Sequence, residues 1–220
     1  GLRTRIGGRE TLGGAMRILG GLAAWLVMAG TALAAPNVTN VTQKGSLLLF
    51  ADIRIDGTWD TLIRLQNDGN SDVDVKCYWM DGNKNRVDFI LPLTANQPIW
   101  FDARTGNGAF RVNPFPQAAA NGFPAWNQHP FLNPSTGPYL KGLLACWAID
   151  GTARSQIKWN HLSGTATVFN GAITSAYEYN ANAFYVPSGV DLSPVGALQG
   201  RLSLNGLEYD ACPLYLIGQF

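Results

Sequence analysis

The stretch that decides the fold is Asp72-Val73-Asp74-Val75-Lys76-Cys77-Tyr78-Trp79, in which polar and apolar side chains alternate. Successive side chains of a β-strand point to opposite faces of its sheet. One face of this strand therefore carries Val73, Val75, Cys77 and Trp79. The other face carries Asp72, Asp74, Lys76 and Tyr78. This pattern predicts a strand with one buried face and one face in water.

The same alternation recurs along the chain and predicts further strands at Ser46–Phe50, Thr61–Gln66, Arg86–Leu93, Pro98–Phe101, Ser155–Trp159, Thr165–Phe169, Ser175–Val186 and Arg201–Leu204. Leu143–Ile149 is apolar on both faces, which is typical of a central strand. Turn-forming pairs such as Asp150-Gly151 and Asn170-Gly171 separate these segments. Beyond residue 35 no stretch keeps a helical period. The sequence predicts an all-β fold, an antiparallel β-sandwich, with residues 36–220 forming one domain.

The segment 16–35 has the layout of a secretory signal peptide: a short charged start, an apolar run and a small-residue end. The apolar run is only about long enough to span a bilayer and closes on Ala32-Leu33-Ala34, so we expect cleavage after Ala34 or Ala35. The mature domain is then exported to the periplasm, cell surface or extracellular space, without inserting into a membrane. Residues 1–15 precede Met16 and are interpreted as upstream translation. The apolar run Leu214–Phe220 has no closing turn, so we expect the natural chain to continue.

Charge argues against nucleic acid as a partner. Four of the 16 basic residues and one of the 15 acidic residues precede Ala35, which leaves 12 basic and 14 acidic residues in the mature part. Nucleic-acid and anionic-membrane surfaces require clustered Lys and Arg. A slightly acidic chain without such clusters does not offer that surface.

Three cysteines, Cys77, Cys146 and Cys212, lie in this exported chain. An oxidising compartment permits disulfides, and the odd count leaves one thiol unpaired. Cys77 and Cys146 both lie in predicted strands, so a bridge between them is plausible. Its loop of about 70 residues would stabilise the fold by roughly 4 kcal/mol in the chain-entropy model. The alternative is that all three are small buried apolar side chains.

Several segments together resemble exported bacterial proteins of uncharacterised function, typified by proteobacteria, with an immunoglobulin-like fold. The resemblance is carried by Lys44–Phe50, Trp59–Asn67, Asp72–Tyr78, Leu91–Gln97, Trp159–Ala166 and Tyr179–Ala181. It implies an immunoglobulin-like sandwich located in the bacterial envelope or outside the cell. It brings no catalytic residues with it.

Residues 102–139 form a long stretch that holds half of the chain's 12 prolines and many aromatic side chains. Long structured loops are often binding elements, so we expect a Pro/aromatic-rich loop with candidate binding residues Phe123, Trp126, His129 and Phe131. Their rings could stack on sugars or contact a protein partner. The same composition would also suit a loop that covers an open sheet face, or a catalytic lid.

Catalytic and metal motifs are missing. The two histidines, His129 and His161, have no partner visible in the sequence, and there is no GxSxG or HExxH motif. The carboxylates Asp52, Asp56, Asp60, Asp81, Asp150 and Glu178 are scattered. The turn with Asp68, Asn70 and Asp72 starts like a calcium loop but lacks its later ligands.

We therefore expect no enzyme, no metal and no cofactor. The sequence favours a structural or interaction module with an unknown protein or glycan partner. The alternatives are a carbohydrate-binding module that uses the aromatic loop 102–139, and a hydrolase built from the dispersed carboxylates.

Overall fold

The computed structural model describes residues 38–82, 84, 86–104, 141–152, 154–196 and 200–213. Ala35–Phe220 forms one unit, and the other unit, Gly1–Ala34, lies outside the described residues. The expectations for the leader, for Phe123, Trp126, His129 and Phe131, and for Leu214–Phe220 also fall outside them. No helix in the described part of the chain is long and apolar enough to cross a membrane.

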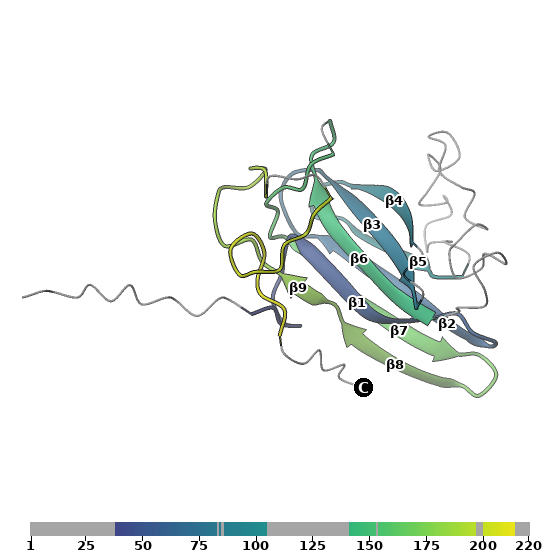
Figure 1. Cartoon of the computed structure of the whole chain (residues 1–220). Helices are drawn as coiled ribbons and strands as arrows, with labels where there is room; N and C mark the ends of the chain where they lie inside the picture. Colours follow the sequence, from purple (N-terminus) through teal and green to yellow (C-terminus); the bar gives the residue numbers. More distant parts are fainter. Residues whose placement is uncertain are drawn as a thin grey trace, which may run out of the picture. The chain divides into compact units, whose positions relative to one another are not determined.

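In the described part of the chain, nine strands form two antiparallel sheets (Figure 1). They are β1 (Leu47–Arg54), β2 (Trp59–Asn67), β3 (Val73–Asp81), β4 (Arg86–Leu93), β5 (Pro98–Asp102), β6 (Lys141–Ile149), β7 (Leu162–Asn170), β8 (Ser175–Asn180) and β9 (Asn182–Phe184). The five-stranded sheet has the order β4-β3-β6-β1-β9, and the four-stranded sheet has the order β5-β2-β7-β8. The prediction of an all-β chain with antiparallel sheets is confirmed.

The core lies between the two sheets and uses the alternation read from the sequence. In β3 the predicted apolar set, Val73 to Trp79 at every second position, is buried, and so is Asp81 at the end of the strand. Trp79 meets Phe101 of the four-stranded sheet, with ring centroids 6.2 Å apart. Ile63 and Val168 of that sheet join the same buried cluster. The sheets therefore pack face to face, as in a β-sandwich.

Around β6 and β9 the outer face of the five-stranded sheet is also buried. β6 lies at the centre of that sheet, as its doubly apolar pattern predicted, and its residues 144–149 are buried. Trp147 and Ile149 pack with Val186, Val195 and Tyr209, which come from the chain after β9. We call residues 185–196 and 200–211 the C-terminal cover. It supplies a second, smaller core on the outside of this sheet.

A disulfide joins Cys77 and Cys146, the pair suggested by the sequence, and Cys212 is a free, exposed thiol. The two bridged residues face each other in the β3–β6 register. The bond therefore links neighbouring strands within one sheet. In antibody domains the conserved disulfide instead links the two sheets.

Two predicted strands are wrong, and a third is divided. Ser155–Trp159 forms only isolated bridges, and Arg201–Leu204 forms no strand. Their alternation has another cause, because Ile157 is buried in the sandwich core and Leu202 and Leu204 pack on the outer cluster. The predicted strand Ser175–Val186 is divided at Ala181 into β8 and β9, which belong to different sheets.

Candidate functional site

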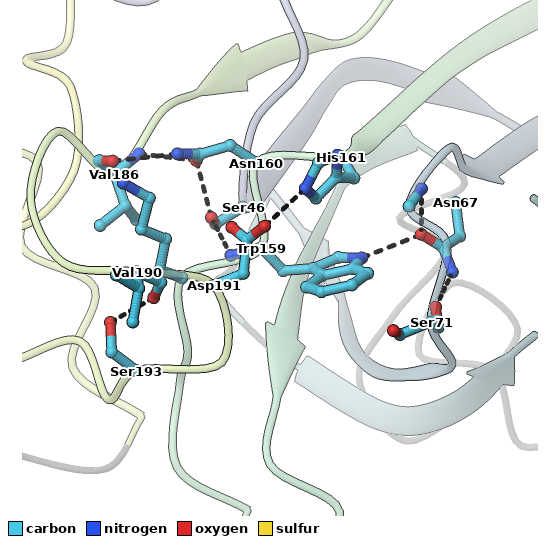
Figure 2. Close-up of polar contacts among 12 residues, drawn as sticks. Ser46, Asn67, Ser71, Trp159, Asn160, His161, Val186, Val190, Asp191 and Ser193 are labelled. Atoms are coloured by element: carbon cyan, nitrogen blue, oxygen red, sulfur yellow. Dashed lines mark hydrogen bonds and ion pairs between the residues drawn. The ribbon is translucent and has the colours of Figure 1, made fainter. Parts of the chain in front are cut away.

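Polar side chains tie the two sheets together at one end of the sandwich (Figure 2). The Ser46 hydroxyl accepts a hydrogen bond from the Trp159 backbone N–H at 2.7 Å and donates to Asn160 Oδ1 at 2.8 Å. Asn160 also bonds both backbone groups of Val186, accepting from its N–H and donating to its carbonyl. The start of β1, the segment before β7 and the start of the C-terminal cover are thus held in one network.

Asn67, at the end of β2, is fully buried and uses every hydrogen-bonding position of its amide. Its Oδ1 accepts from the Gly69 N–H and from the Trp159 indole N–H, each at 2.9 Å. Its Nδ2 donates to the Ser71 carbonyl at 2.9 Å (Figure 2). It also donates to the Thr94 carbonyl at 3.0 Å. A satisfied buried amide of this kind fixes the loops that meet here.

His161 pairs with Asp191 at the surface, with 2.9 Å between Nε2 and Oδ2. Its ring lies edge-on to Trp159, with centroids 4.8 Å apart. No hydroxyl or thiol in the described part of the chain hydrogen-bonds to this ring. The pair therefore has the geometry of a contact between the sandwich and the C-terminal cover, and it lacks the nucleophile of a catalytic triad.

A polar cleft of about 420 Å³ lies where β8 ends. The chain leaves the four-stranded sheet at Ala181, and Gly45 forms the next bridge to β7, through two hydrogen bonds of 3.0 Å with Leu162. The cleft opens beside this bridge and is lined by polar side chains of the segment before β1 and of three strands. We call it the Arg64 cleft. Its polar lining residues are Thr42, Gln43, Lys44, Arg64, Gln66, Ser163, Thr165 and Asn180.

A chain of polar contacts fixes one wall of the Arg64 cleft. Arg64 Nη2 donates to Gln66 Oε1 at 2.8 Å, and Gln66 Nε2 donates to Asp68 Oδ1. Lys44 Nζ lies 2.5 Å from the other oxygen of Asp68. The Arg64 guanidinium also lies 5.6 Å from the centroid of the Trp100 ring. These groups carry two positive charges and one negative charge, which leaves a net charge of +1 on this wall.

The neighbouring strands β7 and β8 offer hydrogen-bonding groups that the protein does not use. Arg64, Thr165 and Asn180 occupy directly opposed positions on β2, β7 and β8. Ser163 lies opposite Gln66. Among the residues that the structure describes, the side chains of Ser163, Thr165 and Asn180 have no hydrogen-bond partner. They are available to a ligand.

Gly45 is required for the chain to pass close to β9 beside the cleft. A Cβ at this position would lie 2.5 Å from the Phe184 carbonyl oxygen, which is closer than real Cβ atoms come. The network in Figure 2 and the contact at Gly45 together position Lys44. Asp68 is fixed in a similar way, because its N–H donates to the His161 carbonyl at 3.0 Å.

The carboxylates considered from the sequence are each held by separate partners. Asp52 accepts from the Tyr177 hydroxyl, and Asp60 lies 3.6 Å from the Arg104 guanidinium. Glu178 accepts from Thr167 Oγ1 at 2.9 Å. Burial, together with the hydrogen bond to Asp52, raises the pKa of Tyr177 to about 12. Burial also raises the pKa of the Asp60 carboxyl.

Three aspartates, Asp72, Asp74 and Asp150, line a second cavity of about 460 Å³. Asp72 Oδ1 accepts the Ala95 N–H and Asp150 Oδ1 accepts the Thr152 N–H. Burial raises the pKa of the Asp74 carboxyl. Within the described ranges, no group of three or more His, Cys, Asp or Glu residues could hold a metal ion.

Sequence reasoning missed the Arg64 cleft altogether. Its residues are ordinary solvent-facing positions of strands, and only the end of β8 and the Gly45 bridge bring them together. The one available signal was Gly45 itself, a glycine directly before a strand, which often marks a close backbone approach.

The likeness to exported immunoglobulin-like proteins stays an expectation that the quoted residues carry. The features that bear on function are the Arg64 cleft and the C-terminal cover on the five-stranded sheet. No protein-family model, no curated protein and no solved structure matches this chain.

Proposed function

We propose that this chain is an exported, non-catalytic interaction module of the bacterial cell envelope or extracellular space. The observation that carries the proposal is the difference between the two outer sheet faces. Around β6 and β9 the outer face of the five-stranded sheet is buried under the C-terminal cover. The four-stranded sheet carries a row of outward polar side chains and the Arg64 cleft at its end.

The outward face of β2, β7 and β8 is suited to a polar partner. Arg64 and Glu178 are exposed, and Thr165 and Thr167 stand between them on β7. Leu62, 38% exposed, is a large apolar side chain on the same face. Mixed polar and apolar groups of this kind are typical of interfaces that form and dissociate. We call the outward side of the four-stranded sheet the open face.

Export is supported by two independent features. The leader 16–35 has the order of charge, apolar run and small residues that secretion requires. The Cys77–Cys146 disulfide fits an oxidising compartment, because cytosolic thiols are kept reduced. A stable extracytoplasmic domain would benefit from such a bridge.

The immunoglobulin-like part of the proposal rests on the consecutive strands β2 and β3, which lie in opposite sheets as the B and C strands of that fold do. Two features depart from antibody domains. The first is strand pairing, because β1 pairs with β6 and β7 pairs with β2. The second is the disulfide, which stays within one sheet. We therefore propose a relative of that architecture in which β1 and β7 have exchanged sheets.

The interaction surface can be tested with two leucines of similar chemistry. Leu62→Asp changes the open face, whereas Leu207→Asp changes a leucine that is 73% exposed on the C-terminal cover. We expect the full chain to sediment with isolated bacterial envelopes or extracellular polymer, and the first variant to lose this binding while the second keeps it. Equal binding of both variants, or no binding by the unchanged chain, would contradict the proposal.

The proposed location outside the cytoplasm can be tested by cell fractionation and thiol alkylation. We expect the chain outside the cytoplasm, with Cys212 as its one alkylatable cysteine before reduction. A cytoplasmic chain with three reactive thiols would rule out the exported module.

A further inference from the structure

We propose that the Arg64 cleft binds a saccharide unit bearing a carboxylate, of the uronic acid type. This inference rests on the proposed function as an interaction module and names the chemistry of one ligand. It places the site on the open face of the four-stranded sheet, at residues different from those of the aromatic loop 102–139.

The charge of the cleft matches one carboxylate, which is the charge of a single acidic saccharide unit. Arg64 and Lys44 contribute two positive charges, and Asp68 offsets one of them through its contacts with Lys44 and Gln66. The guanidinium has five N–H donors, and its one hydrogen bond within the described residues goes to Gln66. The remaining donors can bind a carboxylate through two parallel hydrogen bonds.

The rest of the cleft selects hydroxyl groups. Ser163 and Thr165 offer hydroxyls, and Asn180 offers both a donor and an acceptor, all without partners among the described residues. Arg64, Thr165 and Asn180 lie on three successive strands, so they span roughly 10 Å at the usual strand spacing of about 4.8 Å. A carboxylate at Arg64 with ring hydroxyls toward Thr165 and Asn180 would use the whole row.

The cleft is formed before a ligand arrives. The Gln66 contact and the Trp100 ring hold the Arg64 side chain, and Asp68 holds Lys44. The volume of about 420 Å³ lies within the range of small-molecule sites. Donors that are already held in place lose less conformational freedom on binding, and this strengthens the binding of a polar ligand.

The test is a titration of the full chain, labelled with ¹⁵N, with galacturonic acid trimer. Galactose trimer keeps the hydroxyls without the charge, and acetate keeps the charge without the ring. We expect the acidic trimer to shift the amide signals of Ser163, Thr165 and Asn180, and both other probes to bind at least tenfold more weakly. This binding should weaken as salt is added.

Two arginine variants make the test specific. Arg64→Gln removes the charge in the cleft, and Arg86→Gln removes a matched exposed arginine from β4 in the other sheet. The first variant loses charge-assisted hydrogen bonds, so its affinity for the acidic trimer should fall by about 10- to 100-fold. The second variant should bind as the unchanged chain does.

Asn180→Asp is a second test if Arg64→Gln fails to fold. It places a negative charge at an exposed position opposite Thr165, so it should also lower the affinity for the acidic trimer. The inference is overturned if the three probes bind alike, if Arg64→Gln binds unchanged, or if no cleft amide shifts at millimolar trimer. Such a failure leaves the interaction module standing, because the Leu62→Asp and fractionation experiments test that proposal without any saccharide.

Discussion

Replacing Asn67 by alanine removes a buried side chain whose amide uses all of its hydrogen-bonding positions at the end of the sandwich. The buried amide makes four hydrogen bonds, two as acceptor and two as donor. Alanine leaves the indole N–H of Trp159, which is only 2% exposed, without its acceptor. It also leaves the carbonyls of Ser71 and Thr94 without this donor.

Each of these hydrogen bonds contributes about 1 kcal/mol net to the free energy of unfolding. The four together give about 4 kcal/mol, with a range of roughly 3 to 5 kcal/mol because water can reach some of the groups left unpaired. For a chain of this size, each kcal/mol lowers the melting temperature by about 2 to 4 °C. We therefore expect Asn67→Ala to melt about 10 °C or more below the unchanged protein.

Urea unfolding followed by circular dichroism measures this loss directly. The control is Asn205→Ala, because the Asn205 side chain is exposed and accepts hydrogen bonds from two backbone N–H groups of a surface turn. We expect that change to cost at most about 1 kcal/mol. Trp159→Phe combined with Asn67→Ala should cost less than the two single changes added together. A loss below about 1 kcal/mol for Asn67→Ala would refute the reasoning.

Three further changes test other parts of the fold. Cys77→Ser should lower the free energy of unfolding by about 4 kcal/mol, measured in urea, because the bridge closes a loop with a sequence separation of 69. Gly45→Ala should destabilise the chain strongly, because its Cβ would overlap the backbone of β9, whereas Gly171→Ala meets no atom within 4 Å and should melt almost unchanged. Tyr177 should titrate at about 12 in its ultraviolet absorbance, because of burial and its hydrogen bond to Asp52. The unfolded chain releases this proton at about 10, so the stability from Tyr177 is present below that pH and falls as the pH rises toward 12, a loss that Tyr177→Phe should remove.

Side-chain alternation was sufficient to predict most of the sandwich. It located β4 at Arg86–Leu93 without error and identified the inward face of β3 and the central position of β6. These strands follow local patterns, because each one buries a face against the same core. The pairing of Cys77 with Cys146 depends on register, which those patterns could suggest but not determine.

The C-terminal cover and the Arg64 cleft depend on distant contacts. Leu202 and Leu204 alternate like a strand, yet they pack on the outside of the five-stranded sheet without strand hydrogen bonds. The cleft exists because β8 stops at Asn180 and Gly45 takes the next place beside β7. No periodicity in the sequence records where a strand leaves its sheet.

Carbodiimide labelling of exposed carboxylates tests most directly whether the open face of the four-stranded sheet binds envelope material. Glu178 lies exposed on that face, and Asp191 lies exposed on the C-terminal cover. Labelling of the full chain is measured by mass spectrometry with and without bacterial envelope material. We expect envelope material to protect Glu178 and to leave Asp191 as reactive as before. Protection of Asp191 alone, or of neither carboxylate, would contradict it.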